Sequence, residues 1–121
     1  MPPRLLPSAI TLAHYRALFV RLDLGRALAN STLVATAVTL IALVLDSMAG
    51  YAFAKLPFAG RARLFAVLLA ALVVPGQVAM LPLFLLVKRL HLVNTYGGVV
   101  VPGMASIFGI LLVRQYALSI P

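Results

Sequence analysis

The sequence predicts an all-α membrane protein, a polytopic bundle of about three transmembrane helices with a short N-terminal interfacial helix. Three observations support this prediction. The chain has 121 residues, is 64% hydrophobic and has a mean hydropathy of +1.12, whereas a soluble domain is about half apolar. Several apolar stretches are long enough to cross a bilayer. Basic residues flank these stretches, as is typical of helix ends at a membrane surface.

The N-terminal segment, residues 1–29, is expected to lie outside the membrane core and to hold a short amphipathic helix. Residues 1–10 are rich in proline and predicted to be irregular. Thr11 is a suitable helix cap. Apolar residues then recur at helical spacing, namely Leu12, Tyr15, Phe19 and Leu22. Such a helix fits either the membrane interface or the outer surface of the protein itself.

The first predicted span covers residues 31–54 and carries one charge, Asp46. One face is small and polar, with Thr32, Thr36, Thr39, Asp46 and Gly50 in line and Ala35, Ala42 and Ala49 beside them; Leu43 on this face is the exception. The opposite face is apolar and suits lipid, with Leu33, Val38, Ile41, Val44, Leu45 and Met48. The polar face is therefore predicted to point into the bundle.

Asp46 is the clearest candidate for a functional residue, because ionisable groups inside a membrane segment are costly. We predict that Thr36, Thr39, Asp46 and Gln77 line a substrate pathway. The alternative for Asp46 is a carboxyl group that is protonated or hydrogen-bonded to a neighbouring helix.

The second predicted span, residues 64–87, is interrupted midway by Pro75 and Gly76. Pro75 frees the carbonyl of Ala71, and such a break persists in a membrane only where protein or water satisfies the freed group. Interrupted helices mark transport pathways in many carriers. Pro75 and Gly76 are therefore predicted to form a flexing point, and the alternative is a plain kink shaped for packing.

The third predicted span, residues 97–118, is the shortest. Ala105 and Gly109 form a small-xxx-small pair that suits close helix contact. Arg114 lies at the far end, where its side chain can reach the membrane surface.

The turn between the first two spans carries a resemblance. The segment Gly50-Tyr51-Ala52-Phe53-Ala54-Lys55-Leu56, with Phe58 and Gly60-Arg61 after it, resembles permease subunits of binding-protein-dependent ABC importers of the carbohydrate-uptake branch, the maltose and glycerol-phosphate type. Further similar stretches follow the family's order: Thr11-Leu12 with Tyr15 to Phe19, Val74 to Val78 with Pro82-Leu83-Phe84, Leu92 with Asn94-Thr95-Tyr96, Phe108-Gly109-Ile110, Arg114-Gln115-Tyr116 and Ser119-Ile120-Pro121.

The resemblance implies a partial type I ABC importer permease fold over residues 1–121, in the bacterial inner membrane. It implies a translocation path for a sugar or related solute and three kinds of partner: a second permease subunit, cytoplasmic ATPase subunits and an extracytoplasmic solute-binding protein. Family members have a further helix before Thr11 and a Glu-Ala-Ala loop after Pro121, so a chain truncated at both ends is expected. A small stand-alone membrane protein and a non-functional truncated permease remain alternatives.

Membrane orientation is predicted differently by charge and by resemblance. The side of the N-terminal region and the second loop holds six basic residues, Arg4, Arg16, Arg21, Arg26, Lys88 and Arg89. The other side holds four, Lys55, Arg61, Arg63 and Arg114. The count weakly favours a cytoplasmic N-terminus. The resemblance places the loop from Lys55 to Arg63 in the cytoplasm instead, and we follow it, so residues 1–29 are expected to be extracytoplasmic.

Other functional classes lack support in the sequence. The net charge of +8 is explained by helix-end anchors facing lipid headgroups rather than by a nucleic-acid partner. There is no cysteine, and no Gly-Lys-Ser/Thr phosphate-binding loop occurs. Asp23 and Asp46 lie in different environments, so they do not form an acid/base pair. We therefore expect no enzyme, no catalytic residue, no metal and no cofactor.

Overall fold

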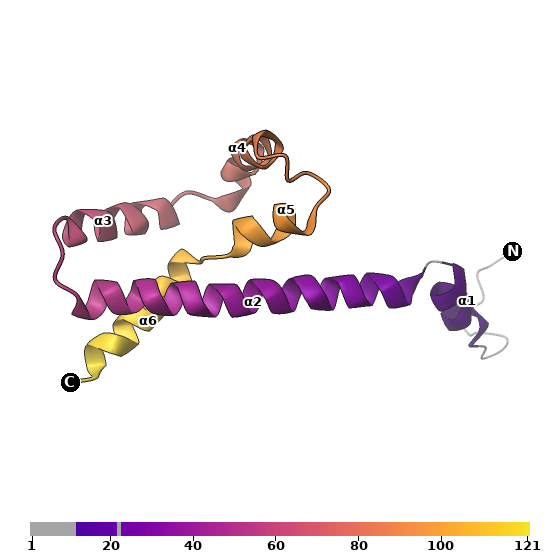
Figure 1. Ribbon diagram of the computed structural model, residues 1–121, viewed down its shortest axis with the longest axis horizontal. Helices are drawn as coiled ribbons and strands as arrows, with labels where there is room; N and C mark the ends of the chain where they lie inside the picture. Colours follow the sequence, from indigo (N-terminus) through magenta and orange to yellow (C-terminus); the bar gives the residue numbers. More distant parts are fainter. Residues whose placement is uncertain (1–11, 22) are drawn as a thin grey trace, which may run out of the picture. The chain divides into compact units, whose positions relative to one another are not determined.

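A computed structural model describes residues 12–21 and 23–121 of the chain. Within these ranges the regular elements are all helical, which confirms the predicted fold class (Figure 1). The chain divides at Leu33 into two units, and each is described by itself. The elements in order are α1 (Ala13–Arg21), α2 (Leu24–Lys55), α3 (Arg61–Leu72), α4 (Gly76–Arg89), α5 (Tyr96–Val100), the 3-10 helix η1 (Val101–Gly103) and α6 (Ile107–Ser119).

The first unit contains α1 and the start of α2. The side chains of Leu12, Tyr15 and Phe19, which belong to the predicted apolar stripe, are exposed. Asp23 has a left-handed φ of 50°, and its carbonyl accepts hydrogen bonds from the N–H groups of Arg26 and Ala27 at 3.0 and 3.2 Å, which begins α2. The proposed cap Thr11, the stripe residue Leu22 and residues 1–10 lie outside the described residues.

Helix α2 occupies the first predicted span and starts earlier than expected, at Leu24 rather than near Ser31. The difference has a physical reason: apolarity marks the part of a helix that suits lipid, whereas the helix itself continues through polar residues such as Arg26 and Asn30. The helix ends at Lys55, just before Pro57. By length and hydropathy it is the one described helix that could cross a membrane unaided.

Helices α3 and α4 occupy the second predicted span but are bent by 107° relative to each other. Figure 1 shows the two helices pointing in different directions. The break lies where Pro75 predicts it. Pro75 has φ −60° and ψ 132°, an extended conformation, and caps α4. The carbonyl of Ala71, which Pro75 cannot bond, accepts a hydrogen bond from the N–H of Val74 at 3.2 Å. The freed group is therefore satisfied inside the turn.

The region of the third predicted span begins with a turn whose residues carry the Leu-x-Asn-Thr part of the resemblance. Asn94 adopts a left-handed φ of 60°. The hydroxyl of Thr95 donates to the carbonyl of Leu92 at 2.7 Å and accepts from the N–H of Gly98 at 3.1 Å, which caps α5. Helices α5 and η1 together form one arm and α6 forms the other, and the two arms are bent by 41° relative to each other. If each bent pair is one span, the described residues hold up to three.

The best-buried positions lie on α6 and on the part of α2 that belongs to the second unit. The buried apolar residues among those described are Ile110 and Ala117 of α6, and the buried residues of α2 are Asp46 and Gly50. Most large apolar side chains of the described chain are exposed. In a membrane protein such surfaces face lipid or other helices.

Candidate functional site

The candidate site is the contact between the second half of α2 and the length of α6. Asp46 is 7% exposed, although it is a carboxylate in the middle of an apolar helix. Its Oδ1 atom accepts a hydrogen bond from the backbone N–H of Ser106 at 2.9 Å. Ser106 is the N-cap residue of α6. Asp46 therefore satisfies one of the N–H groups that a helix start leaves unpaired.

Gly109 provides the space that this carboxylate occupies. A Cβ atom added at Gly109 would lie 2.8 Å from Cγ of Asp46 and would overlap its Oδ2 atom. The sequence predicts close helix contact from the pair Ala105 and Gly109. Gly109 makes this contact with α2, whereas Ala105 is exposed. The alternative interpretation of Asp46, a carboxyl group hydrogen-bonded to a neighbouring helix, matches this geometry.

Farther along, α6 runs in the same direction as α2 and stays close to it. A Cβ atom at Gly50 would lie 2.7 Å from Cβ of Val113 and 2.9 Å from the carbonyl oxygen of Ile110. At the end of α2, the Nζ atom of Lys55 donates to the carbonyl oxygen of Ile120. The contacts of Asp46, Gly50 and Lys55 thus meet successive parts of α6, and the small-residue face of α2 is a packing face at Gly50.

The contact also extends to η1, and this corrects one expectation. Val38 was assigned by its helical position to the lipid-facing side of the first span. A Cβ atom at Gly103 would lie 3.0 Å from Cγ1 of Val38, and Val38 is half-buried. The reason is that η1 approaches α2 from the side of Val38, a direction that the polarity of α2 alone does not reveal.

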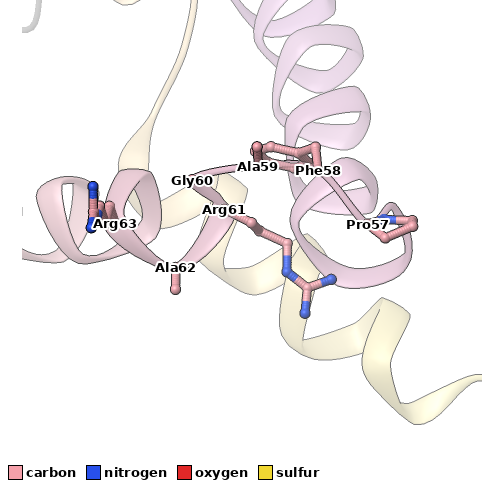
Figure 2. Close-up of a pocket in the computed structure, with 7 residues that line it drawn as sticks. All are labelled: Pro57, Phe58, Ala59, Gly60, Arg61, Ala62 and Arg63. Atoms are coloured by element: carbon pink, nitrogen blue, oxygen red, sulfur yellow. The ribbon is translucent and has the colours of Figure 1, made fainter.

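The turn after α2 is held by aromatic and basic side chains. Gly60 has φ 82°, a left-handed conformation that glycine adopts without strain, and it precedes α3. Figure 2 shows Arg61 and Arg63 leaving this turn in different directions. The Nη1 atom of Arg61 donates to the carbonyl of Leu56 at 3.2 Å. The exposed basic residues predicted to mark a membrane surface therefore lie together at one end of the unit.

Three aromatic rings connect α2, the turn and α3 at this end. The ring of Phe53 lies 5.8 Å from that of Phe58 and 5.7 Å from that of Phe65, measured between centroids. The guanidinium carbon of Arg114 lies 4.1 Å from the centre of the Phe65 ring, a cation–π contact that joins α6 to α3. Arg114, predicted to reach the membrane surface, thus contacts a ring within the unit.

The structure does not gather the predicted pathway residues into one site. Thr36 and Thr39 are exposed on α2, and Gln77 is exposed near the start of α4. Asp46 alone is buried, beneath the start of α6. Pro75 and Gly76 stand at the junction before α4. The pathway role of the four side chains and the flexing role of Pro75 and Gly76 stay predictions.

The sequence reasoning missed Ser106 as the partner of Asp46. A signal was present: Ser106 directly precedes an apolar run, as the N-cap residue of a helix often does. The contacts of Lys55 with Ile120 and of Arg114 with Phe65 carried no comparable signal. Among residues 12–21 and 23–121, no group of three or more His, Cys, Asp or Glu side chains could hold a metal ion.

Comparison with known proteins identifies similar chains. The arabinooligosaccharide transport system permease of Halalkalibacterium halodurans is 36% identical over 116 residues, which is 95% of this chain and 42% of that protein. A probable ABC transporter permease of Pyrococcus horikoshii is 34% identical over 121 residues, 95% of this chain and 43% of that protein. The sn-glycerol-3-phosphate transport system permease of Brucella abortus is 32% identical over 127 residues, 99% of this chain and 45% of that protein.

The chain spans less than half the length of the curated relatives that it matches. No protein-family model and no solved structure matches it. The similarity nevertheless runs through 95–99% of the chain. The resemblance is therefore confirmed: over nearly its whole length this chain is homologous to part of the permease subunits of carbohydrate ABC transport systems.

Proposed function

We propose that the chain forms part of the translocation path of an ABC importer for a sugar or a related solute. The observation that carries this proposal is the 36% identity to an arabinooligosaccharide permease across 95% of the chain. At that coverage the similarity includes α2, the bent helix pair and α6, the elements that make up the described unit.

The class of solute is inferred from the range of similar permeases. Their names include transport systems for arabinooligosaccharides, lactose, alpha-glucosides, trehalose and sn-glycerol 3-phosphate. These solutes share a polyhydroxylated, strongly hydrated surface. Hydroxyl and amide side chains on exposed helix faces suit such a surface, since they exchange hydrogen bonds with it. We propose that Thr36 and Thr39 of α2 and Gln77 of α4 face the solute path.

The partners follow from the same proposal. They are a second permease subunit, cytoplasmic ATPase subunits and an extracytoplasmic solute-binding protein. The relatives are transport permeases rather than enzymes. We propose that ATP hydrolysis belongs to the partner subunits and that this chain needs no cofactor of its own. The proposed location is the bacterial inner membrane, crossed near residues 31–54, 64–87 and 97–118.

The bent pair of α3 and α4 supports a role in transport. An interrupted helix in a membrane needs protein or water around its free backbone groups, and water-lined breaks are common where transporters hold their solutes. Gln77 lies in the first turn of α4, directly after this break. We propose that the junction at Pro75 and Gly76 flexes as the path opens and closes.

The test is solute uptake in the organism that encodes this chain. Its gene is removed, and ATP-dependent uptake is measured for labelled arabino-oligosaccharide, lactose, α-glucoside, trehalose and glycerol 3-phosphate. The proposal predicts loss of uptake of at least one of these solutes and recovery when the gene is returned. Unchanged uptake of all five, with this chain verified as absent, would contradict the proposal.

The pathway residues are tested in the same cells by single substitutions to leucine. Thr36→Leu, Thr39→Leu and Gln77→Leu are each expected to lower uptake at equal amounts of chain in the membrane. The matched control is Val44→Leu, because Val44 is exposed on the apolar side of α2. If the three variants transport as well as the control, these residues do not line the path.

A further inference from the structure

Helix α6 begins with half of a capping box. In the complete motif, the N-cap Ser accepts a hydrogen bond from the N–H three residues on, and a Glu or Gln at that position accepts the N–H of the Ser. The first half is present, because Ser106 Oγ accepts from the N–H of Gly109 at 3.0 Å. The second half is missing from α6 itself, since position 109 is glycine and the first turn holds no acidic residue.

We propose that Asp46 of α2 supplies the missing half, so that the capping box of α6 is completed by a second helix. Its Oδ1 atom accepts the N–H of Ser106 at 2.9 Å, the bond that a Glu at position 109 would make. A side chain at position 109 would start in the space that the Asp46 carboxylate fills. Asp46 and Gly109 are therefore two parts of one device: the first provides the carboxylate, and the second leaves room for it.

The membrane explains why the start of α6 needs this partner. Helices α5, η1 and α6 together are long and apolar enough to form one membrane span, with a 41° bend before α6. If this pair is one span, α6 begins inside the apolar layer, where no bulk water can bond its free N–H groups. The N-terminus of a helix also carries the positive end of the helix dipole, which attracts a carboxylate. The hydrogen bond between them therefore offsets two costs at once: that of burying the Asp46 carboxylate and that of burying an unpaired N–H group at the start of α6.

In this arrangement Asp46 is a positioning residue that contacts α6, so this inference adopts the helix-contact alternative for Asp46 in place of a position in the solute path. It sets the position of α6 along α2, because a shift by one turn would place the carboxylate against apolar side chains. The inference goes beyond the proposed transport activity: it concerns the pairing of two helices for any solute, or for none, and rests only on the proposal that the third span crosses the membrane.

The chain contains no cysteine, so an introduced pair of cysteines can form a disulfide only with each other. Val38→Cys and Gly103→Cys are introduced together to report on the start of the third span. A Cβ atom at Gly103 would lie 3.0 Å from Cγ1 of Val38. The sulfur of a cysteine at residue 38 would occupy the position of this Cγ1 atom, so the distance suits a disulfide. The full chain is expressed in membrane vesicles, and the initial rate of disulfide formation with copper phenanthroline is measured.

Four changes are compared in this background. Asp46→Ala removes the cap and is expected to slow cross-linking about fivefold, the shift in population that loss of a helix cap typically produces. Gly109→Glu alone is also expected to slow it, since the new side chain collides with Asp46. The double variant Asp46→Ala with Gly109→Glu moves the carboxylate into α6 and is expected to restore the rate to within about twofold. Asp46→Asn keeps an acceptor oxygen and is expected to stay near the parent rate.

Ser47→Ala is the matched control, since Ser47 neighbours Asp46 on α2 and is exposed. It is expected to cross-link as the parent does. The proposal is overturned if Asp46→Ala also cross-links at the parent rate, or if the double variant is as slow as the slower single variant. If Asp46→Ala leaves no chain in the membrane, the amount of membrane-embedded double variant decides: recovery supports the proposal, and equal loss overturns it.

Discussion

The guanidinium carbon of Arg114 lies 4.1 Å from the centre of the Phe65 ring, which joins the second half of α6 to the start of α3. Its Nε atom is buried without a hydrogen-bond partner among the described residues. The electron-rich face of the ring therefore compensates part of the hydration that the cation loses. The same end of the unit holds the contact of Lys55 with Ile120, so two basic side chains from different helices hold the end of α6 in place.

A double-mutant cycle measures the Arg114 contact. The variants Arg114→Met, Phe65→Leu and their combination are unfolded by SDS titration in mixed micelles. We expect a coupling free energy of about 0.5–2 kcal/mol, the range of cation–π pairs from exposed to desolvated sites. Phe53→Leu combined with Arg114→Met is the control pair, because Phe53 contacts Phe65 rather than Arg114. Additive effects in the first cycle would show that the ring does not stabilise the cation.

The close approach at Gly50 leads to a second prediction. Gly50→Ala places a methyl group 2.7 Å from Cβ of Val113 and is expected to destabilise the chain by about 1–3 kcal/mol, the usual cost of overpacking. Gly25→Ala is the matched control on the same helix, because nothing lies within 4 Å of a Cβ atom there. That change is expected to stabilise by about 0.5–1 kcal/mol through helix propensity. Equal effects at the two sites would contradict close packing of α6 on α2.

A third prediction concerns the bend between α3 and α4. Pro75→Ala restores the missing N–H and is expected to favour a continuous helix through residues 73–75. Spin labels at Arg63→Cys and Lys88→Cys report the change by pulsed electron resonance. A straight helix would separate the two α-carbons by about 37 Å at 1.5 Å per residue, whereas the 107° bend brings them closer.

Pro82→Ala is the control for this measurement, because Pro82 lies inside α4 and the helix continues through it. We expect the label separation to lengthen with Pro75→Ala and to stay unchanged with Pro82→Ala. If neither variant changes the separation, the bend is held by something other than the proline.

The positions of the helix breaks were predictable from the sequence because they depend on local chemistry. Pro57 and Gly60 indicate the end of α2 and the start of α3, and Pro75 indicates the start of α4. The size of the bend at Pro75 was not predictable. A proline removes one hydrogen bond and so marks where a helix breaks, but the angle depends on the groups that pack around the junction.

The partner of Asp46 was not predictable for a different reason. Polarity showed that Asp46 needs a partner, and the two alternatives named a solute path and a neighbouring helix. The donor is a backbone N–H sixty residues away, at Ser106, and every residue except proline carries such a group. The pair becomes evident only when η1 and α6 are placed against α2, which depends on long-range packing.

Membrane topology tests the central claim, that this chain crosses the membrane three times as part of a permease. Single cysteines at Ala59, Asn94 and Pro121 are labelled in intact cells with a membrane-impermeant thiol reagent. Lys55 contacts Ile120, so the 56–60 turn and the end of α6 must lie on the same side. We predict no labelling at Ala59→Cys and Pro121→Cys until the cells are opened, and immediate labelling at Asn94→Cys. Labelling of all three in intact cells, or of Ala59→Cys and Pro121→Cys on opposite sides, would contradict three crossings in this arrangement.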